Sequence, residues 1–207
     1  MNTRLPTLYY RADCPFCWKV RIALAELDIQ YLSVETQLGE KHPEVVRLNP
    51  KGSVPVFFDG ETAIWESSVI IEYLLDGPKQ SQLLPSTPEA RSEARLLQSY
   101  SDSVVGPALR GLVFEKRSKS EEEWDLELIE KSCAAWIQCQ EQLASWLGDK
   151  DYFCSQFSIA ECALLARFGI AEFYGAGVTG HLKGVERWYH AGTQRRSFKS
   201  TYPQGLG

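Results

Sequence analysis

The sequence contains three histidines, one methionine and neither a long apolar run nor a cluster of basic residues. No apolar segment approaches the ~20 residues of a membrane span, and the first residues lack the apolar core of a signal peptide. A formal net charge of -5 without basic runs gives no reason to expect a nucleic-acid or anionic-membrane partner. We therefore expect a cytoplasmic protein with no nucleic acid and no membrane among its partners.

The length and composition are those of a soluble globular protein. The 207 residues are 44% hydrophobic, enough for one large domain or two small ones with a real core. Six cysteines without a secretion signal indicate reduced thiols rather than structural disulfides.

The stretch with the strongest chemical signal is Cys14-Pro15-Phe16-Cys17. Residues 7–10 before it are typical of a β-strand, and residues 18–27 after it have the apolar spacing of a helix. Pro15 suits the first turn of that helix, so Cys14 is expected at the helix N-terminus. Free backbone N–H groups and the helix dipole stabilise a thiolate there. Cys17 lies one turn further on, within reach of Cys14, and the pattern predicts a thiol–disulfide active site.

Zinc binding and an inert pair are the alternatives for this motif. A zinc site needs a second pair of ligands. The remaining cysteines form no further CxxC, and the three histidines show no ligand pattern: Cys133, Cys139, Cys154, Cys162, His42, His181 and His190. Redox or glutathione chemistry without a metal is therefore favoured, and an inert pair in a fold that has lost its activity stays open.

The rest of the first half predicts a mixed sheet in the order β-α-β-α-β-β-α. We expect strands at 29–35, 54–58 and 61–65, a short helix ending near Asn49, and a hairpin at Asp59-Gly60. A helix is expected at 67–75, with an apolar stripe formed by Val69, Ile70, Tyr73 and Leu74.

Pro55 interrupts the third expected strand and admits two interpretations. It can mark an edge strand, or the Val54–Pro55 peptide can be cis. A cis bond would leave the Val54 N–H and C=O free to pair with an extended peptide ligand. The residues leave this choice open.

The second half predicts helices only. Residues 78–88 form an expected linker, followed by helices at 89–100, 108–114, 121–147, after Ser158, and at 181–190. Ser158 and Glu161 form an S-x-x-E capping box, which is a folding feature. Cys162 is expected to be a buried small hydrophobe, and Arg195 and Arg196 to be solvated.

Three blocks together resemble the glutathione S-transferase superfamily: the Cys14-Pro15-Phe16-Cys17 motif after a first strand, and residues 49–56 and 65–74. The resemblance covers the whole chain. It implies a thioredoxin-like glutathione-binding domain at 1–77, the linker at 78–88 and an all-helical bundle domain at 89–207.

The resemblance also implies the residues that hold glutathione. Val54, before the cis-proline Pro55, would pair with the cysteinyl backbone, and Glu66 and Ser67 would receive the γ-glutamyl group. Ser67 at a helix N-terminus suits a carboxylate, although a plain helix cap is the alternative for this pair. Lys51 would meet the glycyl carboxylate, and Phe16 would line the site. The second substrate would lie between the domains, against Tyr100, Val104, Leu112 and Phe114.

A cysteine at the catalytic position resembles the omega and beta classes and the two-domain glutaredoxins. This implies a glutathione-dependent thiol transferase or reductase with Cys14 as nucleophile and Cys17 able to resolve a disulfide. Glutathione would be co-substrate, the other substrate a small-molecule or protein disulfide, and dehydroascorbate reduction a further activity. The family implies a homodimer. The alternative is a non-catalytic binding protein of the stringent starvation type, which acts on transcription; a membrane-inserting chloride-channel-like relative is disfavoured by the missing apolar span.

Overall fold

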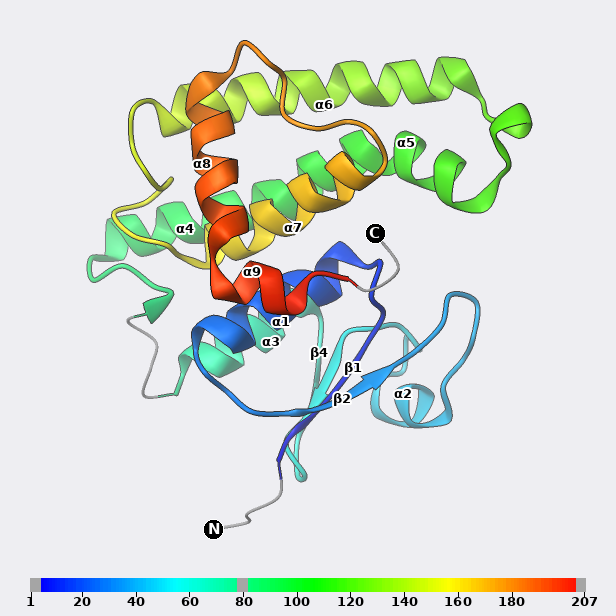
Figure 1. Cartoon of the computed structure of the whole chain (residues 1–207). Helices are drawn as coiled ribbons and strands as arrows, with labels where there is room; N and C mark the ends of the chain where they lie inside the picture. Colours follow the sequence, from blue (N-terminus) through cyan, green and yellow to red (C-terminus); the bar gives the residue numbers. More distant parts are fainter. Residues whose placement is uncertain (1–4, 78–81, 204–207) are drawn as a thin grey trace.

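The first half of the chain folds around a four-stranded mixed sheet (Figure 1). The computed structural model describes residues 5–77 and 82–203. Strands β1 (Thr7–Tyr10), β2 (Leu32–Glu35), β3 (Val56–Phe58) and β4 (Ala63–Trp65) lie in the order β2-β1-β3-β4. β1 pairs in parallel with β2 and antiparallel with β3, which pairs antiparallel with β4. With helices α1 (Pro15–Glu26), α2 (Pro43–Leu48) and α3 (Ser67–Leu75), the predicted β-α-β-α-β-β-α order is confirmed.

Alternating side chains of the strands cover the two faces of the sheet. Leu8 of β1 and Phe57 of β3 belong to the main core, which also holds buried residues of α1 and α3. Their neighbours Tyr9 and Val56 form a second cluster with Val45 of α2. Because successive strand residues point to opposite faces, the sheet lies between α1 and α3 on one side and α2 on the other.

The remainder of the described chain is helical, as the sequence predicts. Its elements are α4 (Pro88–Tyr100), the π-helical turn η2 (Ser101–Val105), α5 (Gly106–Ser118), the 3₁₀ turn η3 (Glu121–Glu123), α6 (Leu126–Leu147), α7 (Ile159–Phe173), α8 (Lys183–Gln194) and α9 (Arg196–Thr201). In Figure 1 these helices form the upper part of the molecule, except that α9 lies beside α1, between the other helices and the sheet. Every residue of α7 from Ile159 to Ala171 is buried, so this helix is the centre of the bundle.

The predicted capping box is confirmed and fixes the start of α7. Glu161 accepts hydrogen bonds from the Ser158 N–H at 2.8 Å and the Ser158 hydroxyl at 2.7 Å. It also accepts the Phe153 N–H at 2.8 Å. The buried carboxylate thus satisfies backbone donors of the preceding loop, which is a structural role.

Several predicted element boundaries are wrong: the strand expected at 61–65 is β4 alone, and the helix expected at 108–114 spans all of α5. The second strand is β2 alone and is largely exposed, because it forms an edge of the sheet. The third strand begins at Val56, after the proline that cannot donate to the ladder. The long helix begins at Leu126 rather than residue 121, because the Asp125 side chain accepts the Leu128 N–H and caps it.

The predicted apolar stripe of α3 is also partly wrong. Ile70 and Leu74 are buried, but Val69 is 53% and Tyr73 40% exposed. The buried face instead adds Ile71 and Leu75, because α3 packs against α1 and β3. A helix that is apolar almost all round does not reveal from its sequence which face meets the core.

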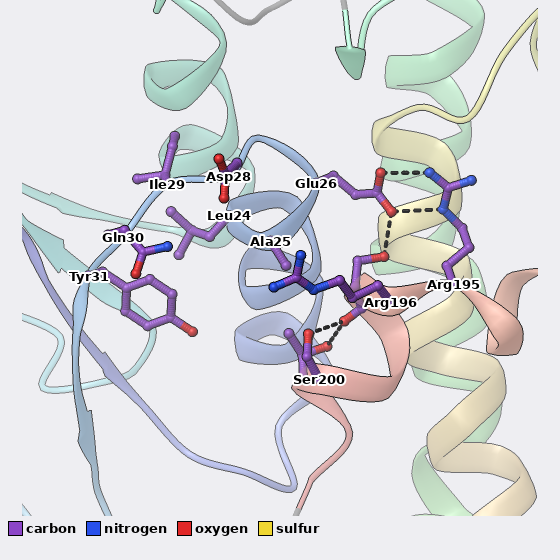
Figure 2. A pocket seen from close by; sticks show the side chains of 12 residues that line it. Leu24, Ala25, Glu26, Asp28, Ile29, Gln30, Tyr31, Arg195, Arg196 and Ser200 are labelled. Carbon is purple, nitrogen blue, oxygen red and sulfur yellow. Dashed lines mark hydrogen bonds and ion pairs between the residues drawn. The ribbon is translucent and has the colours of Figure 1, made fainter.

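The C-terminal segment binds the two halves together and corrects another prediction. The predicted helix at 181–190 lies at 183–194, and α9 follows it. Arg195 is not freely solvated: its Nε and Nη2 each donate to a Glu26 carboxylate oxygen of α1 at 2.7 Å (Figure 2). Arg196 is exposed, as expected. Nearby, the Trp18 indole of α1 donates to the Thr201 hydroxyl at 3.0 Å in the interior.

Residues 78–81 of the predicted linker lie outside the described residues, and the domain boundaries 1–77, 78–88 and 89–207 stay predictions. No helix in the described part of the chain has the length and apolar character needed to cross a membrane.

Candidate active site

Cys14 lies where β1 leads into α1, at the junction of two cavities. It is the N-cap residue of α1, and Pro15 is the first helical residue, as the sequence predicts. The Cys14 side chain is only 6% exposed. It lines a cavity of about 330 Å³ bounded by α5 and a cavity of about 310 Å³ that Val54 also lines. Cys14 therefore borders two spaces that a ligand can occupy.

The surroundings of the Cys14 sulfur favour its thiolate. A hydrogen bond from the Cys17 thiol, the backbone N–H groups of Cys17 and Phe16, and the charge of Arg11 lower the pKa of Cys14 to about 6 against the opposing effect of burial. Burial and the neighbouring Cys14 raise the pKa of the Cys17 thiol well above its ordinary value. The Cys17 sulfur accepts the Arg11 N–H at 3.5 Å. Of the two thiols, Cys14 therefore ionises the more readily, and Cys17 is its hydrogen-bond donor.

Two groups of three charged side chains flank this cysteine, and sequence reasoning missed both. In one, Asp13 pairs with Arg11 and, at 3.1 Å, with Arg117 of α5. In the other, Asp102 of η2 pairs with Lys19 at 2.5 Å and with Arg167 of α7 at 3.5 Å. The only local signal was Lys19, a charged residue on a helix face that is otherwise apolar and buried. Burial lowers the pKa of Lys19, and the charge of Asp102 opposes this shift.

The structure resolves the alternatives at Pro55. The Val54–Pro55 peptide bond is cis. Within the described part of the chain, neither the N–H nor the C=O of Val54 makes a hydrogen bond. Because Val54 and Cys14 line the same cavity, these backbone groups are available to a peptide-like ligand close to the thiol.

The acidic pair at the start of α3 lies on a third cavity. Glu66, Ser67 and Phe16 line a space of about 520 Å³. Glu66 is the N-cap residue, with a positive φ of 70°, but its side chain makes no capping bond. It instead pairs with Lys51 at 2.5 Å. Ser67 is the first residue of α3 and is buried. Because the N-cap side chain makes no capping hydrogen bond, a plain helix cap does not account for Glu66 and Ser67.

The structure therefore brings the predicted residues together around Phe16 and Cys14, but it corrects the predicted second-substrate wall. Phe114 lines the cavity beside Cys14, whereas Tyr100, Val104 and Leu112 do not. Leu112 is buried in the core, and Tyr100 packs edge-on against Trp146 with ring centroids 4.8 Å apart. The α5 residues that line the cavity are Gly106, Pro107, Leu109, Arg110, Val113, Phe114 and Arg117.

The remaining cysteines take no part in this site. Cys133, Cys139, Cys154 and Cys162 are free thiols, and all but Cys133 are buried. Among residues 5–77 and 82–203, no three His, Cys, Asp or Glu side chains are grouped so that they could hold a metal ion.

Comparison with known proteins gives a consistent family. The model of the glutathione S-transferase N-terminal domain matches residues 8–82. A probable glutathione S-transferase of Glycine max is 32% identical over 67% of this chain, and the match spans 59% of that protein. Glutathione S-transferase GstB of Escherichia coli (strain K12) is 28% identical over 91% of this chain and 93% of its own length. Glutathione S-transferase U25 of Arabidopsis thaliana is 30% identical over 77% of this chain and 69% of its own length.

Two further matches bear on the function. The stringent starvation protein A homolog of Histophilus somni is 26% identical over 88% of this chain and 83% of that protein. The crystal structure of a glutathione S-transferase from Methylobacillus flagellatus with glutathione bound superimposes with a TM-score of 0.81 at 28% identity, covering 96% of this chain and 100% of that one. With its four-stranded mixed sheet and helical second half, this chain belongs to the glutathione S-transferase superfamily.

Proposed function

We propose that this protein is a glutathione-dependent thiol transferase in which Cys14 is the nucleophile. The observation that carries the proposal is the Cys14 thiol, whose pKa is lowered to about 6 at the junction of two cavities. Such a thiol is largely ionised at neutral pH, and the thiolate is the form that attacks disulfides. Free thiols and this chemistry suit the reducing cytoplasm.

The reaction balances as two thiol–disulfide exchanges. Cys14 attacks the glutathionyl sulfur of a mixed disulfide R–S–S–G, so that the Cys14–S–S–G bond forms and R–S⁻ leaves. A second glutathione thiolate then attacks the glutathionyl sulfur, which yields oxidised glutathione and restores the Cys14 thiolate. The net change is R–S–S–G plus GSH to R–SH plus GSSG. Cys17 offers a second route, because its thiol lies against Cys14 and can resolve a disulfide within the protein.

The described geometry supports one placement of glutathione. The free N–H and C=O of Val54, after which the chain turns at the cis-Pro55, suit the cysteinyl backbone. Ser67 at the first turn of α3 suits the γ-glutamyl carboxylate, and Glu66 its ammonium group. Lys51 would then turn to the glycyl carboxylate. Its pair with Glu66 is more than half exposed, so exchanging partners costs little.

The test compares wild type with Cys14→Ser and Cys17→Ser in the reduction of a glutathione mixed disulfide. We expect Cys14→Ser to lose thiol transfer completely, because a serine hydroxyl does not ionise at neutral pH. Cys17→Ser keeps a hydrogen-bond donor and is expected to retain the single-cysteine route. Retention of full activity by Cys14→Ser, with an unchanged circular dichroism spectrum, would exclude this mechanism. Dehydroascorbate is a second oxidised substrate to test with the same variants.

We also propose a homodimer that forms through α3 and α4. Val69 and Tyr73 of α3 are exposed, and Leu96 of α4 is 70% exposed. An ion pair between Glu72 of α3 and Arg95 of α4 at 2.8 Å links the two helices, and we infer that these apolar side chains lie on one shared surface. Light scattering after gel filtration is expected to show a dimer for wild type and a monomer for Leu96→Glu; a monomeric wild type would refute the assembly.

The second candidate is a non-catalytic binding protein of the stringent starvation type. The 26% identity to the Histophilus somni protein over 88% of this chain favours it. It predicts that glutathione neither binds nor protects Cys14 from alkylation. Protection of Cys14 by glutathione, or formation of a mixed disulfide at Cys14, would favour the enzyme instead.

A further inference from the structure

The cavity between Cys14 and α5 has an excess of positive charge in a chain whose net charge is -5. Four arginines and two aspartates line it: Arg11, Arg110, Arg117, Arg167, Asp13 and Asp102. By contrast, the cavity over Glu66 is lined by three carboxylates and one arginine. The positive charge is therefore concentrated in the cavity beside Cys14 and not in the neighbouring cavity of the proposed γ-glutamyl site, with which it shares Phe16 and Asp102.

Two of these arginines are engaged by the protein itself. Arg11 pairs with Asp13 and lowers the pKa of Cys14. The side chain of Arg167 is 8% exposed and lies between Asp102, at 3.5 Å, and the Phe16 ring, whose centroid is 4.4 Å from the guanidinium carbon. Glycine at position 106 leaves the room for it, since a Cβ there would lie 2.9 Å from Arg167 Nη2.

The other two arginines retain unused hydrogen-bond donors. Arg117 donates to Asp13 at 3.1 Å, but its Nε is buried and has no hydrogen-bond partner. Arg110 is exposed and pairs with no carboxylate in the part of the chain that the structure describes. Both guanidinium groups contact the Phe114 ring, at 5.4 Å for Arg110 and 4.5 Å for Arg117. Seven residues apart on α5, they lie on one face of the helix.

The rest of the cavity wall is apolar: Pro107, Leu109, Val113 and Ile170 line it together with Phe114. A molecule that fills this space needs an apolar body to cover these side chains and an anionic group to meet the arginines. A planar carboxylate matches the paired donors of guanidinium groups, and an aromatic body suits the Phe114 and Phe16 rings.

We propose that the second substrate is a carboxylate-bearing thiol with an apolar, preferably aromatic body, presented as its mixed disulfide with glutathione. Arg110 and Arg117 hold the carboxylate, the body lies on Leu109 and Val113, and the disulfide faces Cys14. This deepens the thiol-transferase function proposed above and rests on it. In the exchange, Cys14 takes the glutathionyl group, and the carboxylate-bearing thiolate leaves into the positively charged cavity.

The test uses two probes of the same shape, the glutathione mixed disulfides of para-mercaptobenzoate and para-mercaptobenzamide. The kcat/KM of each probe is divided by the rate constant of its uncatalysed reaction with glutathione, measured without protein. This ratio removes the difference in leaving-group chemistry between the two probes. We expect wild type to prefer the acid by about tenfold, the equivalent of about 1.4 kcal/mol. Added salt is expected to lower this preference, because it screens exposed charges.

Substitutions of single arginines test which side chains cause the preference for the acid over the amide. Arg110→Gln is expected to lower the ratio of acid to amide several-fold. Because Arg110 is exposed and unpaired in the described structure, this change does not threaten the fold. Arg117→Gln is expected to act in the same direction, but it also removes a contact to Asp13, so its melting temperature is measured alongside. The matched control is Arg196→Gln on α9, which removes an exposed arginine outside this cavity and should leave the ratio unchanged.

The outcomes separate this inference from the proposed function. Equal use of acid and amide by wild type, or an unchanged ratio in Arg110→Gln, overturns the inference and leaves thiol transfer intact. If neither disulfide is turned over, the proposed function fails, and calorimetric binding of para-methylthiobenzoate and para-methylthiobenzamide still tests the cavity. Tighter binding of the benzoate than of the benzamide, lost in Arg110→Gln, supports the carboxylate site. Equal binding of the benzoate and the benzamide overturns the proposed site.

Discussion

Replacing Cys17 by alanine tests the origin of the low Cys14 pKa. The hydrogen bond from the Cys17 thiol is the largest cause that lowers it to about 6. A hydrogen bond to a charged group contributes about 1.5–3 kcal/mol, and one pKa unit corresponds to about 1.36 kcal/mol. Cys17→Ala is therefore expected to raise the Cys14 pKa by about 1 to 2 units, to about 7 or above. Cys17→Ser keeps a donor and is the matched control, expected to shift it less.

The assay is the pH dependence of Cys14 alkylation by iodoacetamide, read by mass spectrometry of the Cys14 peptide. The midpoint is more informative than the rate at one pH. At pH 7 a thiol with a pKa of about 6 is ~90% ionised, against ~3% for an ordinary cysteine. Its thiolate is, however, roughly tenfold less nucleophilic, because nucleophilicity falls with pKa. The net gain in rate is then only about threefold, whereas the midpoint moves by about 2.5 pH units.

Two results would refute this reasoning. A wild-type midpoint near 8.5 would mean that burial outweighs the hydrogen bonds and Arg11. A midpoint near 6 in both wild type and Cys17→Ala would mean that the backbone N–H groups and Arg11 suffice without the second thiol.

Three further predictions concern the fold and are measured as the free energy of unfolding in urea. Gly169→Ala should destabilise by about 3 kcal/mol, because the new Cβ would lie 2.4 Å from the Trp18 ring; Gly177→Ala, with nothing within 4 Å, is the control and should be near neutral. Ser158→Ala should cost about 1–2 kcal/mol through the lost cap of α7, and a neutral result would contradict that role. Arg195→Ala should lower the free energy of unfolding by about 1–2 kcal/mol, less than the loss of a fully buried ion pair, because its pair with Glu26 is partly exposed. High salt should reduce this loss if the ion pair with α1 is its cause.

Short-range chemistry explains why much of the fold was predictable. The Cys14 motif, the Asp59-Gly60 hairpin and the Ser158–Glu161 capping box each act through neighbours along the chain. Such signals specify where an element begins or turns, independently of what packs on it. The cis Val54–Pro55 peptide bond was one of two alternatives. The local sequence around Pro55 does not distinguish a cis bond from a proline on an edge strand.

The orientation of apolar helices was not predictable in the same way. α3 and α5 carry apolar side chains around much of their circumference, so the sequence admits more than one buried face. Val69 was expected in the core and is exposed, and Leu112 was expected at the substrate and lies in the core. Only the neighbouring elements decide which face is covered.

By itself, the sequence determined the β-α-β-α-β-β-α order, the helical second half and the position of Cys14 at a helix start, because these follow from local backbone chemistry. The tertiary structure decided the electrostatics of the site. Asp13 meets Arg117 from 104 positions away, and Asp102 joins Lys19 to Arg167. Charges so far apart in the chain interact only after packing brings them within a few ångströms, because Coulomb interactions depend on distance and burial rather than on sequence separation.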